Sequence, residues 1–202
     1  PGRAVRAYSE TDFARMPAAS NPEISSADLT DTALLLAAWG APGGRGIALP
    51  TPPPPASMAQ AETVLRTLEL ADETGHITSL GNRVVRLPVG VREARALLAG
   101  ALELGDPALA AEVVAAFSDD HRDAGADLSR LLSDLRAGRA PGAERWRRER
   151  RRLEAIAAEA GGAPAPARAG DSAAIARPGA ASAAGIVTAL ARPEWIAHRV
   201  SE

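Results

Sequence analysis

The chain has 202 residues, enough for one or two domains with apolar cores, and its formal net charge is −2. Cysteine is absent, which excludes disulfides and thiolate metal sites. All 23 basic residues are arginine, as expected from a GC-rich genome, so the number of arginines is by itself a weak functional signal. Any contact with nucleic acid must therefore come from a local basic patch, because overall basic character is missing.

Hydrophobic residues make up 46% of the chain, but many are alanine and aromatic residues are only 3%. This composition favours helices that pack closely through small side chains. No apolar run approaches the ~20 residues of a membrane span, and no signal peptide is visible. We therefore expect a mainly α protein that lies in the cytoplasm. Because the sequence does not begin with Met, we expect a piece of a longer protein or a processed start.

Residues 1–24 read as an extended segment followed by a linker. A first helix is predicted to begin near Asn21-Pro22, with Ser25 or Ser26 as its cap, and to end at Gly40. Its apolar face would carry Leu29, Ala33, Leu36 and Trp39, and we expect Trp39 in the core. Residues 41–55 are rich in Gly and Pro, which indicates a stiff connector; a proline-rich ligand for a signalling domain is the less favoured alternative.

The stretch from residue 56 to residue 88 organises the chain. Apolar residues at helical spacing, Met58, Ala61, Leu65 and Leu68, predict a helix. Asp72-Glu73-Thr74-Gly75 predicts a tight hairpin with positive φ at the glycine. Thr78 then caps a short helix that carries Leu80, Val84 and Leu87 and is closed by Pro88. This order of elements predicts a small winged helix over residues 25–88, with the β-hairpin as its wing.

Residues 89–160 predict a bundle of four helices with short loops. The first carries the stripe of Val91, Ala94, Leu98 and Ala101 and ends at Gly105. Asp106-Pro107 starts the second, Asp127 caps the third, and the fourth begins near Ala143. The inward residues of the last three are Leu109, Val113, Val114 and Phe117, then Leu128, Leu131, Leu132 and Leu135, then Trp146, Leu153, Ile156 and Ala160.

Residues 161–181 are dominated by Ala, Pro and Gly and predict a flexible linker. A further segment, residues 182–202, predicts a helix with Ile186, Val187 and Leu190 that Arg192-Pro193 breaks.

Several strings resemble DEAH-type RNA helicases. T-G-H-I-T-S-L-G-N-R-V-V-R-L-P-V is similar to the family pattern D-x-x-G-x-L-T-x-L-G-x-x-[LMV]-x-x-L-P, and L-L-L-A-A-W-G resembles the family's L-x-L-A-A-W-G. N-P-E-I resembles E-P-E-I with Asn21 in place of the first acid, and L-P-T-P-P resembles L-D-P-P-P with the acid lost. L-A-R-P-E-W-I-A-H-R resembles a motif of the bacterial HrpB branch, although Arg192 replaces an aromatic residue.

The resemblance implies that residues 25–160 are the winged helix and ratchet domain that follow the motor domains of such helicases, beside the channel for single-stranded RNA. It also implies that residues 1–9 form the last strand of the second motor domain, with Val5 and Tyr8 buried or half-buried. The alternative from the residues alone is a disordered tail, because a lone strand cannot hold itself together.

No catalytic residue and no metal site is predicted. A phosphate loop needs a lysine, which the chain lacks, and no D-E-x-H box is present. The ATP and magnesium that the resemblance implies would therefore bind upstream motor domains. Asp119, Asp120, His121 and Asp123 are better explained as a solvated loop than as metal ligands, and His76 and His198 as surface residues.

The strongest functional signal is six arginines in the eight positions from 145 to 152. Guanidinium groups pair with phosphates in a fork and stack on bases. An exposed helix face in an arginine-rich protein explains the same pattern. The predicted nucleic-acid-binding residues are Arg145, Arg147, Arg148, Arg150 and Arg151, with Arg83 and Arg86 as a weaker second set.

Three classes of function fit these observations. The first is a non-catalytic accessory region of an RNA helicase, which binds single-stranded RNA and the upstream motor domains and couples motor movement to strand translocation. The second is a free-standing winged-helix regulator that reads duplex DNA, although Glu62 and Glu69 make the predicted helix a poor reader of a major groove. The third is an interaction scaffold.

Overall fold

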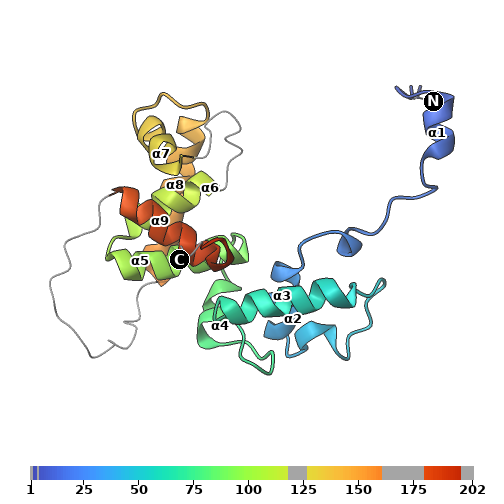
Figure 1. Cartoon of the computed structure of the whole chain (residues 1–202), viewed down its shortest axis with the longest axis horizontal. Helices are drawn as coiled ribbons and strands as arrows, with labels where there is room; N and C mark the ends of the chain where they lie inside the picture. The colour runs from blue at the N-terminus through green and yellow to red at the C-terminus, as the bar shows by residue number, and fades with distance from the viewer. Residues whose placement is uncertain (1, 4, 118–126, 161–179, 197–202) are drawn as a thin grey trace, which may run out of the picture.

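The computed structural model describes residues 2–3, 5–117, 127–160 and 180–196, and the predicted mainly α class is confirmed (Figure 1). Nine α-helices lie in these residues: α1 Glu10–Arg15, α2 Thr30–Ala38, α3 Pro55–Thr67, α4 Ser79–Val84, α5 Val91–Leu104, α6 Pro107–Phe117, α7 Leu128–Arg136, α8 Ala143–Ala160 and α9 Ala180–Ala191. Three 3-10 turns accompany them: η1 Glu23–Ser25, η2 Pro42–Gly44 and η3 Pro193–Trp195. None of the described helices has the length and apolar character that crossing a bilayer requires.

Three predicted helix starts are confirmed by their capping contacts. The Thr78 hydroxyl accepts a hydrogen bond from the Gly81 N–H at 3.0 Å and starts α4. Asp106 accepts from the Leu109 N–H at 3.0 Å, and Asp127 accepts from the Arg130 N–H at 3.0 Å. These contacts satisfy backbone donors that the first turn of a helix leaves without an intrahelical partner.

Two expectations about the first helix were wrong. Asp28, and not Ser25 or Ser26, receives the Thr30 N–H at the start of α2, at 2.8 Å. The hydrogen bond from the Thr30 hydroxyl, followed by this backbone contact, lowers the pKa of Asp28. Trp39 is 69% exposed, because α2 ends at Ala38 and Gly40, at φ 79°, turns the chain away. None of the elements in the described residues covers the indole.

The expected β-hairpin wing is not confirmed, since the described residues contain no strand and only one antiparallel bridge, between Ala71 and Ile77. The turn itself forms as predicted, with Gly75 at φ 87°. The Asp72 carboxylate accepts hydrogen bonds from the Thr74 hydroxyl and from the Thr74 and His76 N–H groups, which lowers its pKa. The β-pairing is limited to this one bridge because α3 ends just before the segment and Thr78, one residue after Ile77, already caps α4.

The helices enclose two apolar cores. α2, α3, α4 and the first half of α5 surround one core, in which Leu34, Leu65, Leu68 and Leu70 are at most 1% exposed. The second core lies among the rest of α5 and α6, α7, α8 and α9 (Figure 1). The domain boundaries drawn from sequence remain a prediction, but the chain after residue 179 adds α9 to the second core. Val187 of α9 is fully buried there, and Gly100 of α5 permits the close approach because a Cβ at that position would lie 3.1 Å from a Val187 methyl group.

The N-terminal arm lies apart from both cores (Figure 1). Val5 is 79% exposed and Tyr8 is 42% exposed, so the expected burial of these side chains is wrong for this chain. The only ring contact of Tyr8 among the described residues is with Phe13 of α1, at 5.9 Å between centroids. Within the described part of the chain no strand is available to pair with this segment, so these side chains have no sheet against which to be buried.

Gly81 provides the first test of the fold. A Cβ at Gly81 would overlap the Leu70 carbonyl oxygen and lie 2.7 Å from Ile77 Cγ1, so we expect Gly81→Ala to lower the free energy of unfolding by about 2 kcal/mol. Urea denaturation measures the change. Gly185→Ala in α9 is the control: a Cβ there meets nothing within 4 Å, so the same exchange should be neutral or stabilising by up to ~1 kcal/mol. Equal effects at both positions would contradict the close approach of α4 to Leu70.

Candidate nucleic-acid interface

The orientation of α8 decides which of its arginines can reach a ligand. Trp146 is 3% exposed, and Leu153 and Ala157 lie buried on the same face of the helix. The Trp146 indole Nε1–H donates to the carbonyl oxygen of Glu112 in α6 at 3.0 Å. A buried indole with a satisfied N–H fixes the rotation of a helix about its axis. The arginines therefore occupy defined positions around α8.

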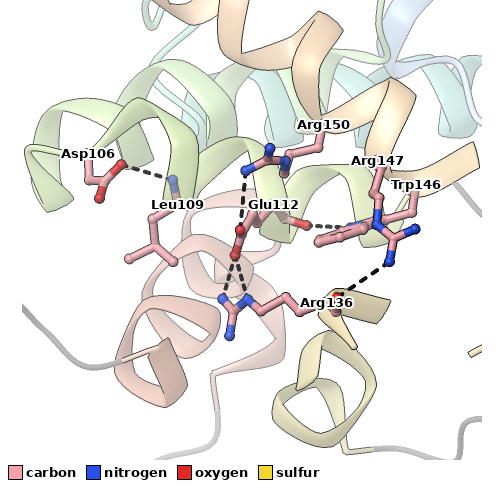
Figure 2. Close-up of polar contacts among 7 residues, drawn as sticks. All are labelled: Asp106, Leu109, Glu112, Arg136, Trp146, Arg147 and Arg150. Atoms are coloured by element: carbon pink, nitrogen blue, oxygen red, sulfur yellow. Dashed lines mark hydrogen bonds and ion pairs between the residues drawn. The ribbon is translucent and has the colours of Figure 1, made fainter. Parts of the chain in front are cut away.

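Glu112 pairs with two arginines, one of α7 and one of α8 (Figure 2). Its carboxylate, 15% exposed, accepts from Arg136 Nε at 2.9 Å and forms an ion pair with Arg136 Nη2. Its other oxygen lies 3.5 Å from an Nη of Arg150. One half-buried acid thus joins α6, α7 and α8. Arg150, predicted to bind nucleic acid, lies in this ion-pair cluster.

Arg147 also lies against protein. It forms an ion pair with Glu144 and donates to the carbonyl oxygen of Arg136, the last residue of α7, at 3.4 Å (Figure 2). A cation at a helix C-terminus interacts favourably with the helix dipole. Arg147 therefore holds α8 against α7.

The remaining predicted residues of α8 are exposed: Arg145, Arg148 and Arg151. At 100° per residue they lie on the arc of the helix opposite Trp146. Within the part of the chain that the structure describes, Arg148 and Arg151 form no ion pair and no side-chain hydrogen bond with another described residue. Their guanidinium groups can therefore take an anionic ligand without giving up a protein contact.

The second predicted set lies at the end of α4. Arg83 is in the last turn of this helix, Arg86 follows it, and both side chains are exposed. His76, predicted to lie at the surface, has a side chain that is 71% exposed. The four-residue cluster Asp119, Asp120, His121 and Asp123, His198 and most of the predicted linker lie outside the described residues. Inside them, no group of His, Asp and Glu could hold a metal ion.

Two arginines of α5 that contact the ends of other helices were not predicted from the sequence. Arg92 forms an ion pair with Glu194 at 2.8 Å and donates to the Ala191 carbonyl oxygen at 3.1 Å. Arg95 donates to the carbonyl oxygens of Leu68, at 3.3 Å, and Leu190, at 3.5 Å, and burial lowers its pKa. The sequence signal for these contacts was the spacing of three residues between Arg92 and Arg95, which puts both on one side of α5 beside its apolar stripe.

Comparison with known proteins shows which class of protein the chain is similar to in sequence. The chain is 33% identical over 99 residues (48% of the chain) to the ATP-dependent RNA helicase DEAH13 of Arabidopsis thaliana. It is 31% identical over 102 residues (50% of the chain) to the probable ATP-dependent RNA helicase DHX35 homolog of Caenorhabditis elegans. About half of the chain is thus homologous to DEAH-type RNA helicases, as the sequence motifs predicted. No protein-family profile matches the chain.

A solved structure shares the fold of this chain. The fold matches the crystal structure of the Escherichia coli DExH-box NTPase HrpB with a TM-score of 0.59 and 23% identity, over 74% of this chain. The predicted resemblance to HrpB is therefore confirmed at the level of the fold. The chain spans only 8% and 14% of the two helicase relatives and 18% of the HrpB chain.

The Glu112 cluster yields a second prediction. Glu112→Ala leaves the Arg136 and Arg150 guanidinium groups without their counter-ion, so we expect the free energy of unfolding to fall by ~2 kcal/mol. Glu144→Ala is the matched control on α8, because Glu144 is 78% exposed and surface ion pairs contribute only about 0–1 kcal/mol. Urea denaturation of both variants measures the difference. Equal losses would show that Glu112 is no more than a surface partner.

Proposed function

We propose that this chain is a non-catalytic accessory region of an HrpB-type RNA helicase, formed by a winged helix and a ratchet bundle, and that it binds single-stranded RNA in the cytoplasm. The single observation that carries the proposal is the pair of exposed guanidinium groups, Arg148 and Arg151, on a rigidly held helix. The homology to RNA helicases supports a nucleic acid as the anionic ligand.

Binding would rest on the phosphate backbone. A guanidinium group pairs with two phosphate oxygens in a fork, and such charge-assisted hydrogen bonds are stronger than neutral ones. Trp146 and Glu112 fix α8 before a ligand arrives, so little conformational freedom is lost on binding. The exposed arginines of this face would contact phosphates and not bases, so we expect RNA binding without sequence preference.

The catalytic machinery would lie in motor domains upstream, which would bind ATP and magnesium. In the proposed assembly the accessory region lines one side of the strand channel and follows the motor as it closes. Arg92 and Arg95 support this coupling role, because they tie α5 to the ends of α9 and α3. A displacement of one core would therefore be passed to the other.

The alternative, a reader of duplex DNA, finds little support in α3. Arg66, its basic residue in the last turn, is half-buried and donates to the Thr63 hydroxyl at 3.1 Å. Glu62 lies on the same helix. A recognition helix needs exposed donors toward the major groove.

The RNA-binding face is tested by neutralising its two exposed arginines. We expect the double variant Arg148→Ala/Arg151→Ala to bind a 15-nucleotide uridine oligonucleotide about tenfold more weakly, equivalent to ~1.4 kcal/mol. The slope of log affinity against log salt should fall by ~1.4, or about 0.7 for each phosphate contact. Fluorescence anisotropy over a salt series gives both quantities.

The matched control replaces two arginines away from this face, Arg66→Ala/Arg130→Ala, with the same change in net charge. Its salt slope should equal that of the parent chain. If the two double variants behave alike, general charge and not the α8 face governs binding. If the parent chain prefers a duplex DNA of equal length, the regulator alternative replaces the helicase proposal.

A further prediction concerns ATP. The purified chain has no phosphate loop, so phosphate release from ATP should equal the buffer blank with and without RNA. A malachite-green assay on fractions across the gel-filtration peak checks this. Turnover that follows the protein peak would contradict a non-catalytic region.

A further inference from the structure

The segment that follows α4 and helix α8 lie far apart in sequence but are joined by a hydrogen bond in the structure. An Nη of Arg152 in α8 donates to the carbonyl oxygen of Pro88 at 2.9 Å, across 64 residues of chain. Pro88 lies two residues after Arg86. Since consecutive Cα atoms are ~3.8 Å apart, the Arg86 Cα lies within about 8 Å of the Pro88 Cα. The exposed face of α8 and the end of α4 are therefore neighbours.

Arg152 connects the two elements and does not itself offer a free guanidinium. Its other Nη forms an ion pair with Glu149 at 2.6 Å. Leu87 packs against the first core, whereas Arg86 and Pro88 on either side of it are exposed. The contact thus holds the backbone after α4 against α8 and leaves the Arg86 side chain at the surface.

The charges around this junction favour a polyanion. From residue 75 to residue 92 the sequence contains no acidic residue, although the chain has 25 acids in total. On α8 the two acids among the arginines are already paired, Glu144 with Arg147 and Glu149 with Arg152. Arg86, Arg148 and Arg151 form no ion pair with another described residue, and the next acid along the chain, Glu93, has its carboxylate beside Gly90.

We propose that one strand of RNA crosses this junction, with successive phosphates on the outer face of α8 and on Arg86 at the end of α4. The inference rests on the proposed function and adds the path of the strand. α8 belongs to the second core and α4 to the first, so a strand on this path bridges both cores. Arg152 acts as a positioning residue that keeps the two parts of the path in line.

The path is tested with Arg86→Ala in the full chain and a 15-nucleotide uridine oligonucleotide. Loss of one phosphate contact should lower the salt slope by ~0.7 and weaken binding several-fold. Arg66→Ala, on α3 of the same core, is the charge-matched control and should leave the slope unchanged. Far-ultraviolet circular dichroism confirms that both variants stay folded, which is expected because Arg86 is exposed.

The outcomes separate this inference from the function on which it rests. If Arg86→Ala leaves the slope unchanged while Arg148→Ala/Arg151→Ala lowers it, RNA binds α8 alone and the proposed path is wrong. If neither variant alters the slope, the proposed function itself fails. A triple variant, with Arg86, Arg148 and Arg151 all replaced, should lower the slope by ~2.1. If its slope falls no further than that of the double variant Arg148→Ala/Arg151→Ala, Arg86 lies outside the path of the strand.

Discussion

The arrangement of this molecule depends on α5, which contributes to both apolar cores. Val91, Ala94 and Leu98 pack into the first core, and Ala96 and Leu97 into the second. A helix that is apolar over most of its circumference can be stable only if other elements cover it on several sides. The packing of α2, α3 and α4 on one side and of α6 and α9 on the other follows from that requirement.

Polar contacts fix the position of α5 between these neighbours. The Asp31 carboxylate of α2 accepts from the Val91 N–H at 2.9 Å and caps α5 from another helix. Arg92 and Arg95, with side chains only 12% and 13% exposed, are directed to carbonyl oxygens at the ends of α3 and α9. Buried charges are costly unless they are hydrogen-bonded, so these arginines tolerate few other arrangements of the cores. The same contacts explain how a small two-core region could move as one piece.

The arginines of α8 show that a charged run in a sequence contains residues with different tasks. Arg150 shares the half-buried Glu112 with Arg136, and Arg147 closes the gap to the end of α7. These side chains hold the bundle together. The arginines on the opposite arc, Arg148 and Arg151 among them, are exposed and are the proposed contacts to a ligand. The exposed arc carries the proposal, and the homology to RNA helicases supports a nucleic acid as its ligand.

The sequence by itself determined the helices, because their signals are local: Met58, Ala61 and Leu65 share a face at helical spacing, and Thr78 caps α4 through its own hydroxyl. Its motifs also indicated the helicase family. Three features were decided only by the tertiary structure: Trp39 is exposed, the predicted wing has only one β-bridge, and α9 packs into the second core. Whether an arginine meets a carboxylate or solvent depends on residues distant in the chain, such as Glu112 for Arg150, and no local spacing encodes that partner.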